Sequence, residues 1–165
     1  MVYKMKNKYL IFGIFIGALF FSLYYFSITD RHGFNVDKRG FGLAATIYKT
    51  PNCGCCENYI SYLKSNGFKV EKKEVSEGEL ENLKKQVGIP ENLWSCHTVL
   101  LNNYFIEGHV PVEAISKVLS EKPKINGIAL PEMPSGSPGM PGFKLSPFQI
   151  HSVKNDQDQG IFMEI

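Results

Sequence analysis

From residue 44 to residue 122 the apolar positions switch repeatedly between the two-residue period of a strand and the 3.6-residue period of a helix. The segments with strand character are 44–49, 68–75, 96–101 and 104–106. The segments with helical character are 57–65, 77–87 and 111–122. The resulting order of strand, helix, strand, helix, strand, strand, helix predicts a mixed α/β domain.

Turn and capping residues mark where these predicted elements begin and end. Asn66-Gly67 and Gly88 are suited to end the first two helices, and Ser76 is a good N-cap for the second. Asn102-Asn103 makes a tight turn between the last two strands, so these strands are expected to form a hairpin. Pro111 is expected to open the third helix at its first position.

The chain changes character after Ile128. The segment Pro131–Gly142 holds four prolines and three glycines in twelve residues, a composition that rules out a helix or a central strand. Alternation returns at Phe148–His151, and an apolar triplet lies at Ile161–Met163. We expect these last two segments to add a hairpin to the edge of the sheet.

The N-terminal segment is much more apolar than the rest. No charged residue occurs from Tyr9 to Ile28, and twenty helical residues span about 30 Å, the thickness of a bilayer's hydrocarbon core. Lysines precede this run, so the positive-inside rule places the N-terminus in the cytoplasm and the remainder outside. A cleaved signal peptide and a buried soluble helix are the alternatives, although Tyr24–Ile28 makes a poor cleavage site.

These patterns divide the chain into four parts. We expect a cytoplasmic basic tail at 1–8, a single transmembrane helix at 9–28, a tether at 29–43 and a domain at 44–165 that faces the periplasm or the cell exterior. The formal net charge of +2 and the lack of a Lys/Arg stripe argue against a nucleic-acid partner. Cysteines of such a domain lie outside the cytoplasm, where disulfides persist.

Four cysteines carry the candidate chemistry. Three of them lie in the Cys-Gly-Cys-Cys sequence Cys53–Cys56, at the junction of the first strand and the first helix, and Cys96 is followed directly by His97. A cysteine pair at this junction in this element order is the thioredoxin arrangement, so a thioredoxin-like domain is expected. A helix N-terminus lowers the pKa of a thiol from about 8.5 into the range of roughly 3.5–7.5, which favours thiolate.

Three interpretations of these cysteines remain open. The first is two structural disulfides, and because adjacent cysteines rarely bond, Cys53 with Cys56 and Cys55 with Cys96 is the expected oxidised pattern. The second is a thiol–disulfide oxidoreductase with Cys53 and Cys56 as its catalytic pair, although Cys96 stands where a thioredoxin carries a cis-proline. The third, a metal site, uses all four thiols.

A metal site would combine three or four thiolates with an imidazole, a donor set that suits Cu(I), zinc or an iron–sulfur centre. A location outside the cytoplasm and nearby methionines favour copper as Cu(I), with zinc as the alternative. The expected ligands are Cys53, Cys55, Cys56, Cys96 and His97, with weaker candidates in His109, Met133 and Met140. The residues expected outside the ligand set are Trp94, in the core or over the site, and the surface or edge residues His32 and His151.

Four motifs occur in the order Tyr48–Cys56, Ser95–Thr98, Ile106–Pro111 and Met133–Met140. Together they resemble the small thioredoxin-like proteins of bacterial copper resistance, the CopG-type copper proteins, from about residue 44 to the C-terminus. The resemblance implies an exported thioredoxin-like domain that binds copper through the Cys-Gly-Cys-Cys cysteines and the Cys-His pair at 96–97. It also implies that thiol redox state can be coupled to copper redox state.

We therefore predict a membrane-tethered protein that binds Cu(I) outside the cytoplasm and serves copper handling or resistance. Its expected partners are copper ions, other copper-handling proteins and the membrane that holds its N-terminal helix. A membrane-anchored thiol–disulfide oxidoreductase is the alternative, and an exchange assay with a model disulfide separates the two.

Overall fold

The computed structural model describes residues 42–165. Its helices are α2 (Gly54–Ser65), α3 (Glu77–Gln86) and α4 (Val112–Glu121), with a 3₁₀ turn at Glu91–Leu93. Its strands are β1 (Ala44–Lys49), β2 (Lys69–Glu74), β3 (His97–Leu101), β4 (Tyr104–Gly108), β5 (Gly127–Leu130), β6 (Gln149–Lys154) and β7 (Gln157–Glu164). The predicted order from the first strand to the third helix is confirmed, with ends within a few residues of those expected.

The predicted tail, transmembrane helix and most of the tether, up to residue 41, lie outside the described residues. Within residues 42–165, no helix combines the length and the apolar character needed to cross a bilayer. Of the predicted tether, only Gly42 and Leu43 are described. Leu43 packs partly buried against the main core, and its carbonyl accepts a hydrogen bond from Lys69 N at 3.0 Å.

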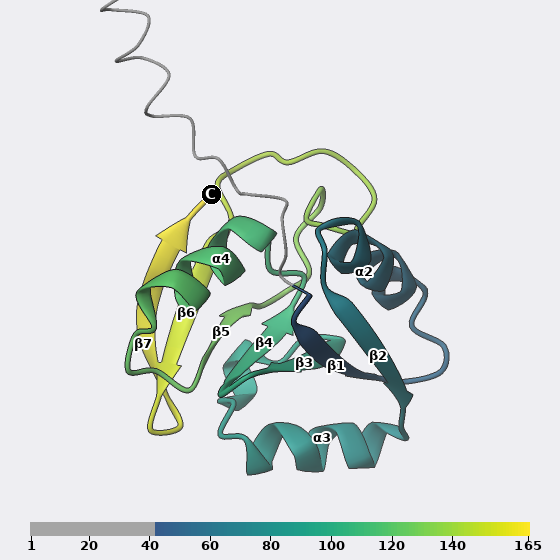
Figure 1. Ribbon diagram of the computed structural model, residues 1–165, viewed down its shortest axis with the longest axis horizontal. Coiled ribbons are helices and arrows are strands. Elements are labelled where there is room, and N and C mark those ends of the chain that lie inside the picture. Colours follow the sequence, from purple (N-terminus) through teal and green to yellow (C-terminus); the bar gives the residue numbers. More distant parts are fainter. Residues whose placement is uncertain (1–41) are drawn as a thin grey trace, which may run out of the picture. The chain divides into compact units, whose positions relative to one another are not determined.

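The described strands form one seven-stranded sheet in the order β2-β1-β3-β4-β5-β6-β7 (Figure 1). β1 pairs with β2 and β4 pairs with β5 in parallel, and the other neighbours are antiparallel. The predicted β3–β4 hairpin is confirmed, as is the β6–β7 hairpin at the sheet edge. The sequence did not predict β5, because a four-residue strand that starts with a glycine carries too little alternation to recognise.

Helices cover both faces of the sheet: α2 and α4 lie over one face and α3 over the other (Figure 1). The main apolar core lies between the sheet and the helices α2 and α4, where Ile47, Val99 and Leu101 meet Leu63 and Ile115. Each of these side chains is at most 2% exposed, and burying one of this size stabilises the fold by roughly 1.5–3 kcal/mol. Successive residues of β3 point to opposite faces, so this strand carries side chains into both layers.

The helix ends agree with the local sequence signals, with one correction. Ser76 caps α3 in a capping box: its hydroxyl accepts from Glu79 N–H, and the Glu79 carboxylate accepts from Ser76 N–H at 2.8 Å. Pro111 is the N-cap of α4 and not its first helical residue, because its ψ of 147° is extended. Cys53 is the N-cap of α2 without a side-chain capping bond, so its sulfur is left for other chemistry.

Candidate metal centre

The first half of the site lies at the start of α2. Cys53 ends the turn after β1, where its N–H donates to Thr50 O at 3.2 Å, and the helix begins at the next residue. Residues three apart share one face of a helix, which brings Cys53 and Cys56 together, and their sulfurs form a disulfide. This bond agrees with the first pair of the expected oxidised pattern. Cys55 remains a free thiol, with its Sγ 3.5 Å from that of Cys53.

Cys96 faces this helix end from the neighbouring strand segment. It directly precedes β3, which lies beside β1 in the sheet, so it reaches the N-terminus of α2 although it is distant in sequence. Its Sγ lies 3.6 Å from the Sγ of Cys56 and 3.9 Å from that of Cys55. The expected bond between Cys55 and Cys96 is not formed, and both are free thiols. Their separation is a contact distance, well beyond an S–S bond of about 2.05 Å.

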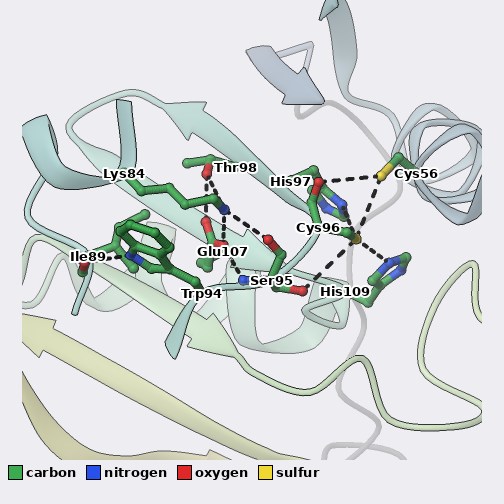
Figure 2. A network of polar contacts seen from close by, with 10 residues as sticks. All are labelled: Cys56, Lys84, Ile89, Trp94, Ser95, Cys96, His97, Thr98, Glu107 and His109. Carbon is green, nitrogen blue, oxygen red and sulfur yellow. Dashed lines mark hydrogen bonds and ion pairs between the residues drawn. The ribbon is translucent and has the colours of Figure 1, made fainter. Parts of the chain in front are cut away.

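Two histidines complete the cluster around Cys96 (Figure 2). Its Sγ lies 3.3 Å from Nδ1 of His97 and 3.2 Å from Nε2 of His109. His97 starts β3 and His109 follows β4, and because the hairpin pairs Thr98 with Glu107, the two histidines are neighbours. His109, a weaker candidate in the sequence, is therefore as close to the thiol as His97 is. The register of the predicted hairpin is the sequence signal that could have identified His109, since it brings His109 beside His97.

The hydrogen bond of His109 determines which of its nitrogens is available. Its Nδ1 lies 2.6 Å from Pro138 O, and because a carbonyl only accepts, Nδ1 carries the proton. In the neutral ring, Nε2 then presents a lone pair toward Cys96 Sγ. Burial lowers the pKa of His109, which favours this neutral form, although the Pro138 carbonyl acts in the opposite sense. Metal-ligating histidines are commonly oriented by such a bond to a carbonyl.

His97 is completely buried and only partly satisfied. Its ring centroid lies 4.7 Å from that of Tyr59 and 4.9 Å from that of His109. Its Nε2 has no hydrogen-bond partner among the described residues. Burial lowers the pKa of His97 well below its ordinary value, and the charges of His109 and Lys84 act in the same direction. A buried nitrogen without a partner costs about 1–3 kcal/mol, so His97 is held in place at a cost in stability.

The charge state of Cys96 depends on whether a cation is present. Burial raises the pKa of its thiol to about 12, and the neighbouring Cys55 adds to this shift. Without a cation, the sulfur is therefore a neutral thiol at neutral pH. Coordination to a metal ion deprotonates a thiol outright, so metal binding at this sulfur releases a proton.

The side chains described so far form two overlapping groups that could hold a metal ion. Within residues 42–165, the ligand atoms of each set all lie within 4.8 Å of one another. One set is Cys53, Cys55, Cys56 and Cys96, and the other is Cys96, His97 and His109. Cys96 belongs to both sets, and neither contains a carboxylate. The donors are therefore sulfur and imidazole nitrogen throughout.

The Pro/Gly-rich segment predicted at 131–142 is a loop that contributes backbone to the site. Besides the carbonyl that holds His109, it places Gly139 against the N-terminal half of α2, where Asn58 Nδ2 donates to the Gly139 carbonyl at 3.2 Å. A Cβ on Gly139 would lie 2.7 Å from Tyr59 N, and its φ is +83°, so only glycine suits this approach. The sequence marked this segment as irregular but could not show that it packs on α2.

The remaining candidates from the sequence lie outside these contacts. Met133 is 37% exposed and Met140 is half-buried, and both lie on the loop. The cluster described above consists of cysteines and histidines, so a role of these two methionines as metal ligands stays a prediction. His151 pairs with a carboxylate at 2.9 Å on the edge hairpin, in line with the edge position expected for it. Trp94 packs in a second core cluster, and its indole donates to a backbone carbonyl at 2.8 Å (Figure 2). His32 lies outside the described residues.

Comparison with known proteins adds two solved structures, both of copper resistance protein CopG, Form 1 and Form 2. They superpose with TM-scores of 0.67 and 0.66 at sequence identities of 36% and 37%. Each covers 74% of this chain, and the alignments include 97% and 98% of the solved chains. A family model described as a protein of unknown function, DUF411, matches residues 93–140, which include Cys96, His97 and His109. No curated protein matches the chain.

Proposed function

This chain belongs to the CopG family of copper resistance proteins, and from that premise we propose that it binds copper as Cu(I) for copper handling or resistance. The resemblance seen in the sequence motifs is thereby confirmed at the level of the family. The proposed ligands are Cys53, Cys55, Cys56, Cys96, His97 and His109.

The convergence of ligands on the Cys96 sulfur is the observation that carries this proposal. Two cysteine sulfurs and two imidazole nitrogens, from α2 and from the ends of β3 and β4, lie 3.2–3.9 Å from it. A disulfide-stapled domain without further chemistry needs no free thiols at such a point and no imidazoles around them. A metal ion would be held by these groups, with His97 offering Nδ1 and His109 offering Nε2.

The donor set supports copper over the other metals considered. Thiolate and imidazole donors without carboxylates select soft ions, and this excludes magnesium and calcium as the natural occupants. Zinc needs only a closed set of four ligands, such as three cysteines and one histidine. The surplus of close thiols and the name of the solved relatives favour Cu(I), with zinc as the alternative.

We also propose that thiol redox state controls this site. In the disulfide between Cys53 and Cys56, neither sulfur can serve as a thiolate ligand. Two electrons and two protons from a dithiol reductant break the S–S bond and give two thiols, which lose their protons as copper binds. The disulfide would thus be the metal-free form and the reduced protein the metal-competent form.

The proposed setting is a thioredoxin-like domain tethered to a membrane. The strand order β2-β1-β3-β4, the parallel β1–β2 pair and the cysteines at the β1–α2 junction support the thioredoxin-like assignment. The charge-free run at 9–28, preceded by lysines, supports a single-pass anchor with the domain in the periplasm or at the cell exterior. A reporter fused after Ile165 should be active only outside the cytoplasm, and activity inside would refute this orientation.

A thiol–disulfide oxidoreductase is the second candidate function, favoured by the disulfide between Cys53 and Cys56 at a helix N-terminus. Against it, residues 42–165 contain no cis peptide bond, and Cys96 occupies the segment where a thioredoxin places its cis-proline. Exchange with a model disulfide would depend on Cys53 and Cys56 and would tolerate Cys96→Ser.

Anaerobic titration tests the proposed function directly. The full-length protein, reduced and in detergent, is titrated with Cu(I) and with Zn(II), and bound metal is measured by elemental analysis. We expect Cu(I) to be retained in the presence of equimolar Zn(II). Stable zinc binding that excludes copper would establish a structural zinc site instead.

A further inference from the structure

A second buried polar network lies behind the cysteine–histidine cluster, on the opposite face of β3 (Figure 2). It joins Lys84 of α3, Glu107 of β4 and Thr98 of β3 to the backbone of Ser95. Lys84 and Glu107 form an ion pair, and their side chains are 3% and 0% exposed. The proposed function uses none of these side chains.

The network holds the chain on both sides of the ligand pair at 96–97. On one side, Ser95 N–H donates to Glu107 Oε1 at 2.6 Å, and the Ser95 carbonyl accepts from Lys84 Nζ at 3.0 Å. On the other side, Thr98 Oγ1 donates to Glu107 Oε2 at 2.6 Å and accepts from Lys84 Nζ at 3.2 Å. One ion pair thus fixes both polar groups of the Ser95 backbone.

Cys96 needs such support because regular secondary structure does not hold it. The chain from Trp94 to Cys96 is irregular, and β3 begins only at the following residue. Gly108 lets this segment pack on β4, since a Cβ there would lie 2.8 Å from Ser95 Oγ. Yet Cys96 is the ligand common to both sets, and a metal ligand has to be held within about 0.5 Å of its working position.

Stability alone is a weak reason for burying this pair. Removing two charges from water is expensive, and well-packed apolar side chains of similar volume are often as stabilising or more so. What apolar side chains cannot supply is a fixed acceptor for Ser95 N–H and a fixed donor for its carbonyl. The position in which the ion pair holds Ser95 therefore explains the burial of Lys84 and Glu107 better than stability does.

We propose that Lys84 and Glu107 are positioning residues of the metal site. They hold Ser95 so that the Cys96 sulfur stays within reach of the α2 cysteines and of the two histidines. They act through the backbone and are not ligands themselves. The inference rests on the proposed function, because it assigns the pair a role at the same site.

Two double variants separate positioning from charge. Lys84→Met with Glu107→Leu removes the ion pair and both of its hydrogen bonds to the Ser95 backbone, while the side-chain volume stays similar. Lys84→Met with Glu107→Gln also removes the charges but keeps a side-chain carbonyl that can accept from Ser95 N–H. The matched surface control is Lys85→Met with Glu91→Gln, which removes an exposed ion pair of 3.9 Å between α3 and the 3₁₀ turn that follows it.

Two readouts are measured on the full-length protein in detergent. The first is Cu(I) affinity of the reduced protein. The second is the rate at which Cys55 and Cys96 form a disulfide, and it needs no copper. The protein, with its Cys53–Cys56 disulfide intact, is mildly oxidised and the new bond is followed by peptide mapping. This bond forms only when the two sulfurs close from 3.9 Å to about 2.05 Å, so its rate reports where Cys96 lies.

We expect the double variant Lys84→Met with Glu107→Leu to lose about tenfold in both readouts, the range typical of residues behind a metal ligand. The Glu107→Gln double variant keeps an acceptor for Ser95 N–H but lacks the Lys84 donor to the Ser95 carbonyl, so it should lose only about threefold, and the surface control should match the wild type. If the first variant does not fold, Glu107→Asp keeps the charge pair but shortens its reach, and it should lose Cu(I) affinity with its secondary structure intact.

Unchanged cross-linking and Cu(I) affinity in a folded Lys84→Met/Glu107→Leu protein would overturn the positioning role. Equal losses in the Glu107→Leu and Glu107→Gln double variants would also overturn it, since charge and not the tie to Ser95 would then matter. If the wild type binds no Cu(I) but the cross-linking rates differ as expected, the proposed function fails and the positioning role stands.

Discussion

Two buried clusters of polar side chains flank β3, one on each face, and they differ in how completely their bonding groups are satisfied (Figure 2). On the face toward α3, the carboxylate of Glu107 and the ammonium of Lys84 have partners from several elements. On the face toward α2, Cys96 is a half-buried thiol among other thiols, and His97 Nε2 is left without a partner.

The difference indicates what each cluster is built for. A polar network in which every member is bonded has nothing left for a ligand and can only fix geometry. A cluster of free thiols and imidazoles around one sulfur has donors left for a ligand, and its unpaired buried nitrogen carries a stability cost. Adjacent residues of one strand, His97 and Thr98, are both buried, and they belong to the proposed binding site and to its proposed support.

Replacing the sulfur shared by both ligand sets should have the largest effect. Cys96→Ser is expected to weaken Cu(I) binding by more than about 100-fold, about as heavily as Cys53→Ser, because loss of a ligand exceeds the 10–100-fold typical of residues behind it. Anaerobic titration measures this, with disulfide exchange followed on the same samples. Wild-type copper binding in Cys96→Ser, with exchange abolished only in Cys53→Ser, would favour the oxidoreductase.

Breaking only one side of the supporting ion pair should have the next largest effect, this time on stability. Lys84→Met leaves the Glu107 carboxylate buried without its counter-charge, and we expect a loss of about 3–5 kcal/mol in the free energy of unfolding. The double variant Lys84→Met with Glu107→Gln should recover most of this loss. Urea denaturation of the metal-free protein measures both, and equal stability of the single variant and the wild type would contradict a paired buried charge.

Acid should destabilise the metal-free protein through the binding cluster. Burial holds the pKa of His97 well below its unfolded value of about 6.5, so below that pH the unfolded state binds a proton that the folded state does not. Stability should therefore fall as pH drops below about 6.5, by up to about 1.4 kcal/mol per pH unit for this residue. Denaturation between pH 7 and pH 5 measures the slope, which His97→Leu should flatten.

His97→Leu should have the smallest effect of the four and should separate binding from folding. Losing one imidazole while the thiolates remain is expected to weaken Cu(I) binding by about tenfold. The metal-free fold should be as stable as the wild type at pH 7 or more so, because the unpaired nitrogen disappears. Cu(I) titration and urea denaturation test this together, and a large loss of stability would show that His97 is structural.

Much of the fold could be predicted because its elements are encoded locally. The apolar strand at 44–49, the N-cap at Ser76 and the Asn102-Asn103 turn are each determined by a few adjacent residues, and all three are found in the structure. β5 escaped prediction because its position depends on pairing with β4 and β6 and not on a pattern of its own.

The sequence by itself determined which donor groups the site contains and where the first of them lie in the fold. Three cysteines within four residues at a strand–helix junction converge on one helix end whatever the rest of the chain does, and Cys96 carries its histidine beside it. Tertiary structure alone decided that His109 joins them, because that depends on the register of the β3–β4 hairpin. It also decided the role of Lys84, a last-turn lysine by sequence, which the packing of α3 on the sheet turns inward to Glu107.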